Sequence, residues 1–316
     1  MTNALILIKY WKSEIQRLAK IHRDCGTREL VKRVKRYFNK EFPKKLNYPL
    51  KLKFNFINGP GTLVVNEDWD NLIILDACRF DIFQKQSRFR NKRLEKKISR
   101  GSWSHEFIKS NFVGKTMHDT VYVTSNGWSR RIPEGTFHQI IPLYDQAEAR
   151  SPETVTQAAL EANNKYPNKR LIIHYMQPHA PHLTELGQQY GWGIWSAALE
   201  GKITHSELVD SYTQTLNIVE SHCETLLNEL VGKTVITSDH GENLGERGFS
   251  DGTGASRFGF NQQLYGHGFQ TPECRFVPWC IIDGSTRKNT SHSEPVTQRE
   301  IDEQKRINNL RDLGYL

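Results

Sequence analysis

The sequence lacks any apolar run long enough to cross a lipid bilayer, so it contains no candidate transmembrane segment. It also lacks the N-terminal pattern of a secretory signal peptide, because the apolar residues 5–8 are too few and Lys9 ends them. Its five cysteines include no closely spaced pair typical of a metal site, so we expect reduced thiols. These absences together predict an intracellular, cytoplasmic protein.

Charged residues of both signs are abundant, but they are unevenly placed. Of the 316 residues, 25% are charged and 37% are hydrophobic, which indicates a globular chain able to bury a large core. The net charge is +8, yet residues 1–53 alone hold 15 Lys and Arg against 4 Asp and Glu. The remaining residues hold 28 against 31, so the basic character belongs to an N-terminal arm.

The arm has the pattern of two amphipathic helices, followed by a connector at residues 43–60. The apolar residues of these helices recur at helical spacing: Leu7, Trp11, Ile15 and Leu18, then Leu30, Val34, Tyr37 and Phe38. Because charge runs are usually solvated faces, we favour helices packed on the body of the protein. The alternative is that residues 1–45 lie on an anionic membrane, at the inner membrane surface. We expect no nucleic-acid binding, since no recognised module or aromatic platform accompanies the charges.

Short apolar runs bounded by polar residues predict five buried strands, at residues 71–75, 120–124, 170–175, 234–236 and 279–282. Helical spacing of apolar residues predicts helices near 152–163 and 206–230, and a shorter one that carries Phe107, Ile108 and Phe112. Polar residues and glycines follow several strands, as in functional loops at the carboxyl edge of a parallel sheet.

The most informative stretch is the string T-S-D-H-G-E-N-L-G-E at residues 237–246, directly after a predicted strand. Asp239 and His240 offer one oxygen and one nitrogen ligand, a pair suited to a divalent metal. Gly241 is predicted to allow a tight backbone turn that aims both side chains at one point. The alternative is a loop with an acidic helix cap and a solvated histidine.

Asp76 directly follows the predicted strand at 71–75, where open α/β sheets bind metals and phosphates. The alternative is that Asp76 caps the next helix. Arg79 either pairs with Asp81 and supports this loop or contacts an anionic substrate.

The string Ser-Asp-His-Gly-Glu followed by Gly-Glu resembles the late metal-binding signature of the alkaline phosphatase and sulfatase superfamily. The resemblance covers about residues 70–283 and implies that the first metal ligand is an aspartate after the first core strand, which Asp76 matches. Sulfatases usually carry a second aspartate next to it, but this sequence has Ala77, which argues against a typical sulfatase metal site.

The resemblance also implies a nucleophile at a helix N-terminus, and the segment 99–107 matches that position. We predict Ser104 as the nucleophile, with Ser102 as the second choice, because the positive end of a helix favours an alkoxide and an approaching anion. The alternative is that Ser104 merely caps the helix. The segment has no Cys/Ser-x-Pro-x-Arg motif, so sulfatase chemistry through formylglycine is disfavoured.

Three histidines match later elements of the superfamily. His179 lies in a Pro-His-x-Pro loop of the kind whose histidine contacts the substrate anion, and His182 follows as a weaker match. His174 is expected to be structural. The insertion at 183–206, rich in Gly and aromatic residues, is predicted to be a lid or a specificity wall. The resemblance implies that His267 completes a second metal site or contacts the substrate.

We therefore expect an αβα sandwich around a mixed, mostly parallel sheet, of the alkaline-phosphatase-like type, with residues 1–53 as basic arm and connector and 54–316 as catalytic domain. The expected activity is metal-dependent hydrolysis of a phosphate, phosphonate or sulfate ester through a covalent serine intermediate. Two alternatives stay open: a membrane-associated transferase that moves a phospho-headgroup onto a glycan or lipid, and a non-catalytic relative that binds a metal or anion.

The expected site has two sets of residues. One divalent cation, which these ligands do not resolve among Zn, Mn, Mg and Ca, is held by Asp76, Ser104, Asp239 and His240. The residues expected to act on the substrate are Ser104 as nucleophile, His179 and His267 on the transferred group or leaving group, and Arg79 and His182 in substrate binding.

Overall fold

The computed structural model describes residues 42–145, 151–247 and 263–296, and the chain divides into two compact units, Met1–Phe56 and Ile57–Leu316. The two helices predicted for the arm lie outside the described residues. The described element that begins in the first unit is the helix α2 (Phe42–Asn58), so the predicted connector at 43–60 is wrong. Pro43 lies in the first turn of α2, where a missing N–H leaves no helical bond unmade.

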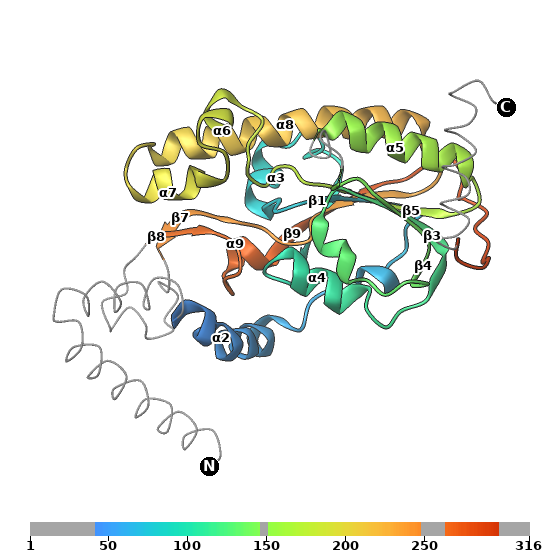
Figure 1. The fold of residues 1–316 in the computed structure, drawn as a ribbon, viewed down its shortest axis with the longest axis horizontal. Coiled ribbons are helices and arrows are strands. Elements are labelled where there is room, and N and C mark those ends of the chain that lie inside the picture. Colours follow the sequence, from blue (N-terminus) through green and yellow to red (C-terminus); the bar gives the residue numbers. More distant parts are fainter. Residues whose placement is uncertain (1–41, 146–150, 248–262, 297–316) are drawn as a thin grey trace, which may run out of the picture. The chain divides into compact units, whose positions relative to one another are not determined.

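The second unit is built on a seven-stranded sheet (Figure 1). Its strand order is β2-β9-β6-β1-β5-β3-β4. Only β9 pairs antiparallel with its neighbours, so the sheet is mixed and mostly parallel, as predicted. The strands are β1 (Asn71–Leu75), β2 (Arg93–Ile98), β3 (Met117–Thr124), β4 (Phe137–Pro142), β5 (Arg170–Tyr175), β6 (Thr234–Thr237) and β9 (Phe276–Ile282).

Side chains of the central strands alternate between two hydrophobic layers, one on each face of the sheet. Ile73 and Leu75 of β1 join the layer that includes residues of α5 (Pro152–Lys165) and α8 (His205–Glu229). Leu72 and Ile74 join the other layer, which includes residues of α4 (Ser104–Asn111). Figure 1 shows α5 and α8 on one face of the sheet and α4 on the other. Because both faces are covered, the strands appear in the sequence as continuous apolar runs, and the predicted αβα sandwich is confirmed.

Shorter elements complete this unit, and some of them contribute to the two hydrophobic layers. They are η2 (Val64–Asn66), α3 (Phe80–Gln86), η3 (Gly127–Arg131), α6 (Glu185–Tyr190), η4 (Gly191–Gly193), α7 (Ile194–Leu199) and α9 (Pro272–Arg275). β7 (Asn243–Arg247) and β8 (Gln263–Gly266) form a separate two-stranded antiparallel sheet. Thr204 and Glu207 form a capping box that fixes the start of α8. Among the residues that the structure describes, none of the helices is both long and apolar enough to cross a bilayer.

A buried carboxyl group links α8 to the chain after α3. Glu220 is fully buried, accepts a hydrogen bond from the Ser87 hydroxyl, and accepts another from the backbone N–H of Arg88 at 3.0 Å. Burial outweighs these bonds and raises the pKa of Glu220 from 4.5 to about 7.

This shift predicts a loss of stability as the pH rises. The folded protein holds the Glu220 proton more tightly than the unfolded chain does, so the stabilisation is complete below about pH 4.5 and is lost as the pH passes about 7. Glu220→Gln keeps the shape of the side chain and removes its titrating proton. The change in the unfolding free energy with pH should therefore be smaller by about 3 kcal/mol in this variant. Urea titrations at about pH 5 and pH 8 measure the difference. If the unfolding free energies of the two proteins change equally between these pH values, Glu220 is not the source of the pH dependence.

Candidate active site

Four parallel strands deliver three of the predicted site residues, and one polar residue that was not predicted, to one edge of the sheet. β6, β1, β5 and β3 are neighbours in that order and run in the same direction. The chain after their carboxyl ends carries Asp239, Asp76, His179 and Asn126, respectively. Ligands of open α/β sheets bind at this edge, so the topology brings together residues that are far apart in the sequence.

Asp76, Asp239 and His240 form a buried cluster in which one ligand atom from each lies within 4.8 Å of the others. His240 Nε2 lies 3.4 Å from Asp76 Oδ1 and 3.5 Å from Asp239 Oδ2. The Ser104 hydroxyl donates to Asp76 Oδ2 at 3.3 Å and lies 3.3 Å from His240 Nε2. The structure therefore brings together all four residues predicted to hold the metal.

The hydrogen bonding within this cluster fits a divalent cation. His240 Nδ1 donates to the carbonyl oxygen of Gly241 at 2.8 Å, so the lone pair of Nε2 faces the carboxylates. Asp76 Oδ1 and Asp239 Oδ2 are buried and have no hydrogen-bond partner among the described residues. Burial, with the charges of Asp239 and Glu242, raises the pKa of Asp76 well above its usual range. A cation ligated by these oxygens and this nitrogen would compensate the buried charge.

Neighbouring groups hold the ligands in place. Asp239 Oδ1 accepts from the backbone N–H groups of Ala77, at 3.2 Å, and His240, at 2.9 Å. Asp76 Oδ2 accepts from Asn126 Nδ2 at 2.7 Å. Ala77 has a φ of 62°, which is uncommon outside glycine, and its carbonyl accepts from the Tyr212 hydroxyl at 2.7 Å. Such strain is maintained by surrounding contacts and is concentrated at functional sites.

Gly241 is required because a side chain would not fit at this position, and not because the backbone takes a left-handed turn. The sequence predicts a tight turn here, but the φ of Gly241 lies outside the positive region. A Cβ atom at this position would lie 2.0 Å from the carbonyl oxygen of Glu273, and the N–H of Gly241 donates to the Cys274 carbonyl at 2.9 Å. The close approach to α9 therefore fixes the segment that carries Asp239 and His240.

Ser104 is not a helix cap, and its hydroxyl faces the buried cluster. It is the first residue of α4, and the N-cap residue is Trp103, which makes no side-chain capping bond. Ser102 bonds instead to Glu106 Oε2 at 3.1 Å and accepts from Gln270 Nε2 at 2.9 Å. The geometry thus favours Ser104 over Ser102, because only the Ser104 hydroxyl faces the buried cluster at the positive end of the helix.

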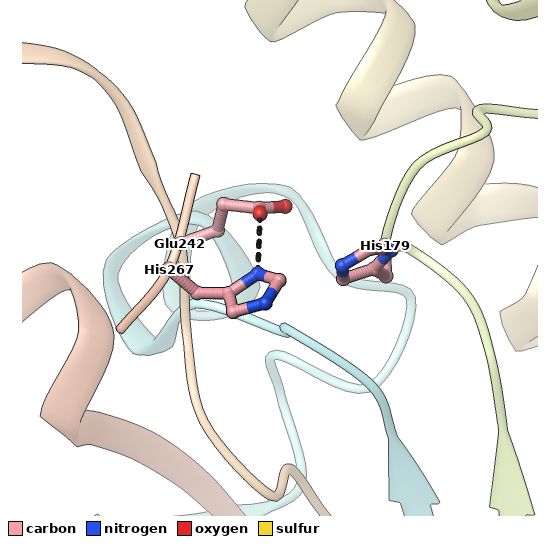
Figure 2. Close-up of side chains that lie close together, drawn as sticks. All are labelled: His179, Glu242 and His267. Carbon is pink, nitrogen blue, oxygen red and sulfur yellow. Dashed lines mark hydrogen bonds and ion pairs between the residues drawn. The ribbon is translucent and has the colours of Figure 1, made fainter. Parts of the chain in front are cut away.

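His179, Glu242 and His267 form a second cluster, with one ligand atom from each within 4.8 Å of the others (Figure 2). His267 Nδ1 lies 3.0 Å from Glu242 Oε1, and the rings of His267 and His240 are 4.7 Å apart. Burial opposes the charged forms, but the attraction between the groups prevails, so the pKa of His267 is raised and that of Glu242 is lowered. Burial lowers the pKa of His179. This cluster can hold either a proton on His267 or a second cation.

Arg79 does not lie where the substrate-binding prediction placed it. Its guanidinium lies 2.8 Å from Asp81 Oδ2, pairs with Glu246 as well, and donates to the Glu242 carbonyl at 3.3 Å. It is buried and does not line the cavity. Contact with a substrate anion would require the loss of two carboxylate partners, so the structure supports the ion-pair alternative.

His182 is also absent from the described wall of the cavity. Its ring packs against Trp195 and Tyr212, and its Nδ1 lies 2.9 Å from the Ser211 hydroxyl. Burial lowers the pKa of His182 to about 4, so the imidazole is uncharged near neutral pH and a poor ligand for an anion. The ring is thus held by partners within the fold, and its role in substrate binding stays a prediction.

His174 lies at the end of β5, as expected of a structural residue. Its Nδ1 is 2.7 Å from the Tyr122 hydroxyl, and its Nε2 is 3.7 Å from Asp239 Oδ2. It therefore lies beside Asp239, where it can orient the side chain that is predicted to hold the metal.

A cavity of about 600 Å³ opens onto the two clusters, and Asp76, Ser104, His179 and His267 contribute to its wall. Trp192, from the predicted lid or specificity wall at 183–206, lines it as well. The other lining residues were not predicted from the sequence: Ser125, Asn126, Gly127, Trp128, Arg130, Arg131, Tyr144 and Met176. Asn126 could have been found, because it follows a predicted strand just as Asp76 does. Glu242 could have been found too, since it belongs to the Asp-His-Gly-Glu string.

No family model matches the sequence, and no curated protein matches it. Among solved structures, the chain is similar to the integral membrane lipooligosaccharide phosphoethanolamine transferase A of Neisseria meningitidis, with 13% identity and a TM-score of 0.45. That match covers 68% of this chain and 47% of the other, so the chain spans about half the length of that protein.

Two further solved structures are similar to the chain. One is the C-terminal periplasmic domain of EptC from Escherichia coli in complex with Zn, with 12% identity, 71% and 76% of the two chains covered, and a TM-score of 0.41. The other is murine ectonucleotide pyrophosphatase/phosphodiesterase 5 in complex with AMP, with 10% identity, 71% and 90% covered, and a TM-score of 0.39. The mixed, mostly parallel sheet covered on both faces is the αβα architecture that the resemblance seen in the sequence implies.

The cluster geometry predicts one tightly bound divalent cation per chain. Asp239→Asn should weaken binding by at least about 100-fold, because it removes a charged ligand from the buried cluster. Glu242→Gln should leave the first cation bound, since Glu242 belongs to the second cluster. Metal content after dialysis, measured by mass spectrometry, tests both statements, with the exposed Asp210→Asn as matched control. Loss of all metal in Glu242→Gln would contradict this division of the site.

Proposed function

We propose that the protein is a metal-dependent enzyme that cleaves a phosphoester through Ser104. The observation that carries the proposal is the position of the Ser104 hydroxyl, 3.3 Å from both Asp76 Oδ2 and His240 Nε2, on the wall of the cavity. Asp76, Asp239, His240 and Ser104 would hold the cation. A divalent cation bound there supplies positive charge that lowers the pKa of the serine hydroxyl and stabilises developing negative charge.

The reaction proceeds in two displacements. Ser104 Oγ forms a bond to phosphorus, and the ester oxygen leaves with the electron pair of the bond that breaks. Water or an acceptor alcohol then attacks the phosphoserine and restores the free hydroxyl. The N-terminus of α4 favours the negative charge on the transferred group during both steps. Phosphorus is preferred to sulfur because the segment around Ser104 has no Cys/Ser-x-Pro-x-Arg motif.

The second cluster acts on the groups that gain charge. His267 is held by its hydrogen bond to Glu242, which raises the pKa of His267 and favours a proton on the imidazole. It lies on the cavity wall, where that proton can pass to the leaving oxygen. His179 lines the same wall, and its Nδ1 donates to the Ala180 carbonyl, which leaves Nε2 for the substrate. The alternative is that these residues hold a second cation, and metal stoichiometry distinguishes the two.

Replacing the nucleophile should abolish turnover. Ser104→Ala is expected to reduce kcat/KM by at least about 1000-fold on whichever aryl phosphate monoester, phosphate diester, phosphonate or sulfate the metal-loaded protein cleaves. In the active protein, acid quenching during turnover should trap a phosphoryl group on Ser104, detected by peptide mass spectrometry. The two measurements are independent, because trapping identifies the residue that becomes modified.

Ser102→Ala is the matched control, since Ser102 is two positions away and bonds to Glu106 and Gln270 instead of the cluster. Its kcat/KM should stay within about tenfold of the unmodified protein. Trapped phosphate on Ser102, or full activity of Ser104→Ala, would refute the proposed mechanism.

A second candidate is that the acceptor is an alcohol at a membrane, which makes the protein a transferase of a phospho-headgroup. The observation in its favour is α2, which contains four lysines and no acidic residue. Leu52, Phe56 and Ile57 of α2 are exposed, and Phe56 is 92% exposed. A basic helix with exposed apolar side chains has the features of a segment that lies on an anionic lipid surface. This candidate places the protein peripherally at such a surface.

Vesicle binding tests the membrane candidate. The full chain should sediment with vesicles that contain phosphatidylserine and not with pure phosphatidylcholine, because lysines near the surface each contribute about 1 kcal/mol. Phe56→Glu should weaken this binding by about tenfold or more, since it removes apolar area from the lipid. Val231→Glu, which changes another exposed apolar residue, is the control. Equal binding to both lipids would contradict the candidate.

A further inference from the structure

The cavity is much larger than the phosphoryl group that the proposed reaction transfers. Its volume of about 600 Å³ is in the range of pockets that enclose a whole small molecule. Asp76 and Ser104 are 1% and 6% exposed and form its floor, whereas Trp192 is 52% exposed and lies at its rim. The rim therefore contacts the part of the substrate that projects away from the reacting phosphorus.

Positive charge gathers on one part of this rim. Arg130 and Arg131 both line the cavity, and Asp76 is the sole acidic residue among its described lining residues. The Arg130 guanidinium pairs with Asp145 and lies 4.3 Å from the centre of the Tyr144 ring, so it is already held in position. Arg131 is exposed and has no ion pair or hydrogen bond of its side chain among the described residues. An unpaired guanidinium on a cavity wall is suited to a phosphate or carboxylate of a ligand.

Aromatic side chains form the neighbouring parts of the rim. Trp128, in η3 with both arginines, is 39% exposed, and its ring packs against Trp103 at 5.2 Å between centroids. The Trp192 ring lies 5.6 Å from the His179 ring. These supported rings offer flat apolar surface between the reacting end of the cavity and its solvent side. A substrate would therefore present carbon-rich structure to the tryptophans and negative charge to the arginine.

We propose that Arg131 binds a second anionic group of the substrate, so that the substrate is a phosphoester whose alcohol half itself carries a phosphate or a carboxylate. This inference rests on the proposed function, because it takes the reacting phosphate to lie at Ser104. Two negative groups then bind one site: the reacting one at the metal ligands and the other at the rim. Arg131 acts here in specificity and touches no reacting atom.

The test measures the affinities of two probes of equal chain length, hexyl phosphate and hexanediol bisphosphate, for the metal-loaded full chain. The bisphosphate should bind about tenfold more tightly than the monophosphate, since a charge-assisted contact to arginine is added. Arg131→Gln should reduce this ratio to about one and leave the affinity for hexyl phosphate unchanged. Arg131→Lys should restore part of the preference, because it keeps the charge. Arg93→Gln, an exposed arginine outside the cavity, is the matched control and should keep the full ratio.

The outcomes separate this inference from the proposed function. Equal affinities for the two probes in the unmodified protein, or an unchanged ratio in Arg131→Gln, overturn the role of Arg131 and leave the reaction at Ser104 standing. Failure of both probes to bind, together with no turnover, overturns the proposed function and this inference with it.

Discussion

The burial of three carboxyl groups close together is the constraint on which this structure depends. Asp76, Asp239 and Glu242 are buried close together, and a carboxylate in a medium of low dielectric constant costs several kcal/mol unless a cation or hydrogen bonds compensate it. Natural proteins retain such a cluster where the charge is used. The other features of the site either supply partial compensation or prevent the chain from relaxing away from the cluster.

Different elements of the fold position and stabilise this cluster of carboxyl groups. The parallel strands β6, β1, β5 and β3 bring the ligands to one edge, and the N-terminus of α4 adds positive potential beside Ser104. Arg79 ties the loop after β1 to Glu246 and to the Glu242 carbonyl, so it stabilises both ends of the cluster without facing the cavity. Gly241 permits the contact with α9 that holds the Asp239 segment. The side chains of the clusters are thus mostly buried and held by several partners, whereas the exposed side chains are at the rim of the cavity.

Much of the fold could be predicted from the sequence, because strands buried on both faces are continuous apolar runs. β1 and β5 have the predicted bounds for that reason. β2 has the sequence R-L-E-K-K-I, with four charged residues of six and none of them buried, so it shows neither an apolar run nor a regular alternation. α2 was taken for a connector because the segment is rich in Pro, Asn and Lys and ends in a turn at residues 58–60. Asp76, Asp239 and His240 could be proposed as metal ligands because each follows a predicted strand, and the structure brings them together. The partners of Arg79 and His182 could not be predicted, because Glu246 and the rings of Trp195 and Tyr212 come from distant segments.

The origin of the ligands in distant segments also bears on how the protein folds. Ser104 and His240 are 136 positions apart, and the cluster exists only after β1 and β6 have paired. Closing such long loops is slow and entropically costly, and a cation cannot repay that cost until the sheet has formed. Bound metal should therefore leave the refolding rate nearly unchanged and slow unfolding, since its contacts belong to the native state and not to the transition state. In the cell, the metal would then set the lifetime of the folded chain rather than the speed at which it matures.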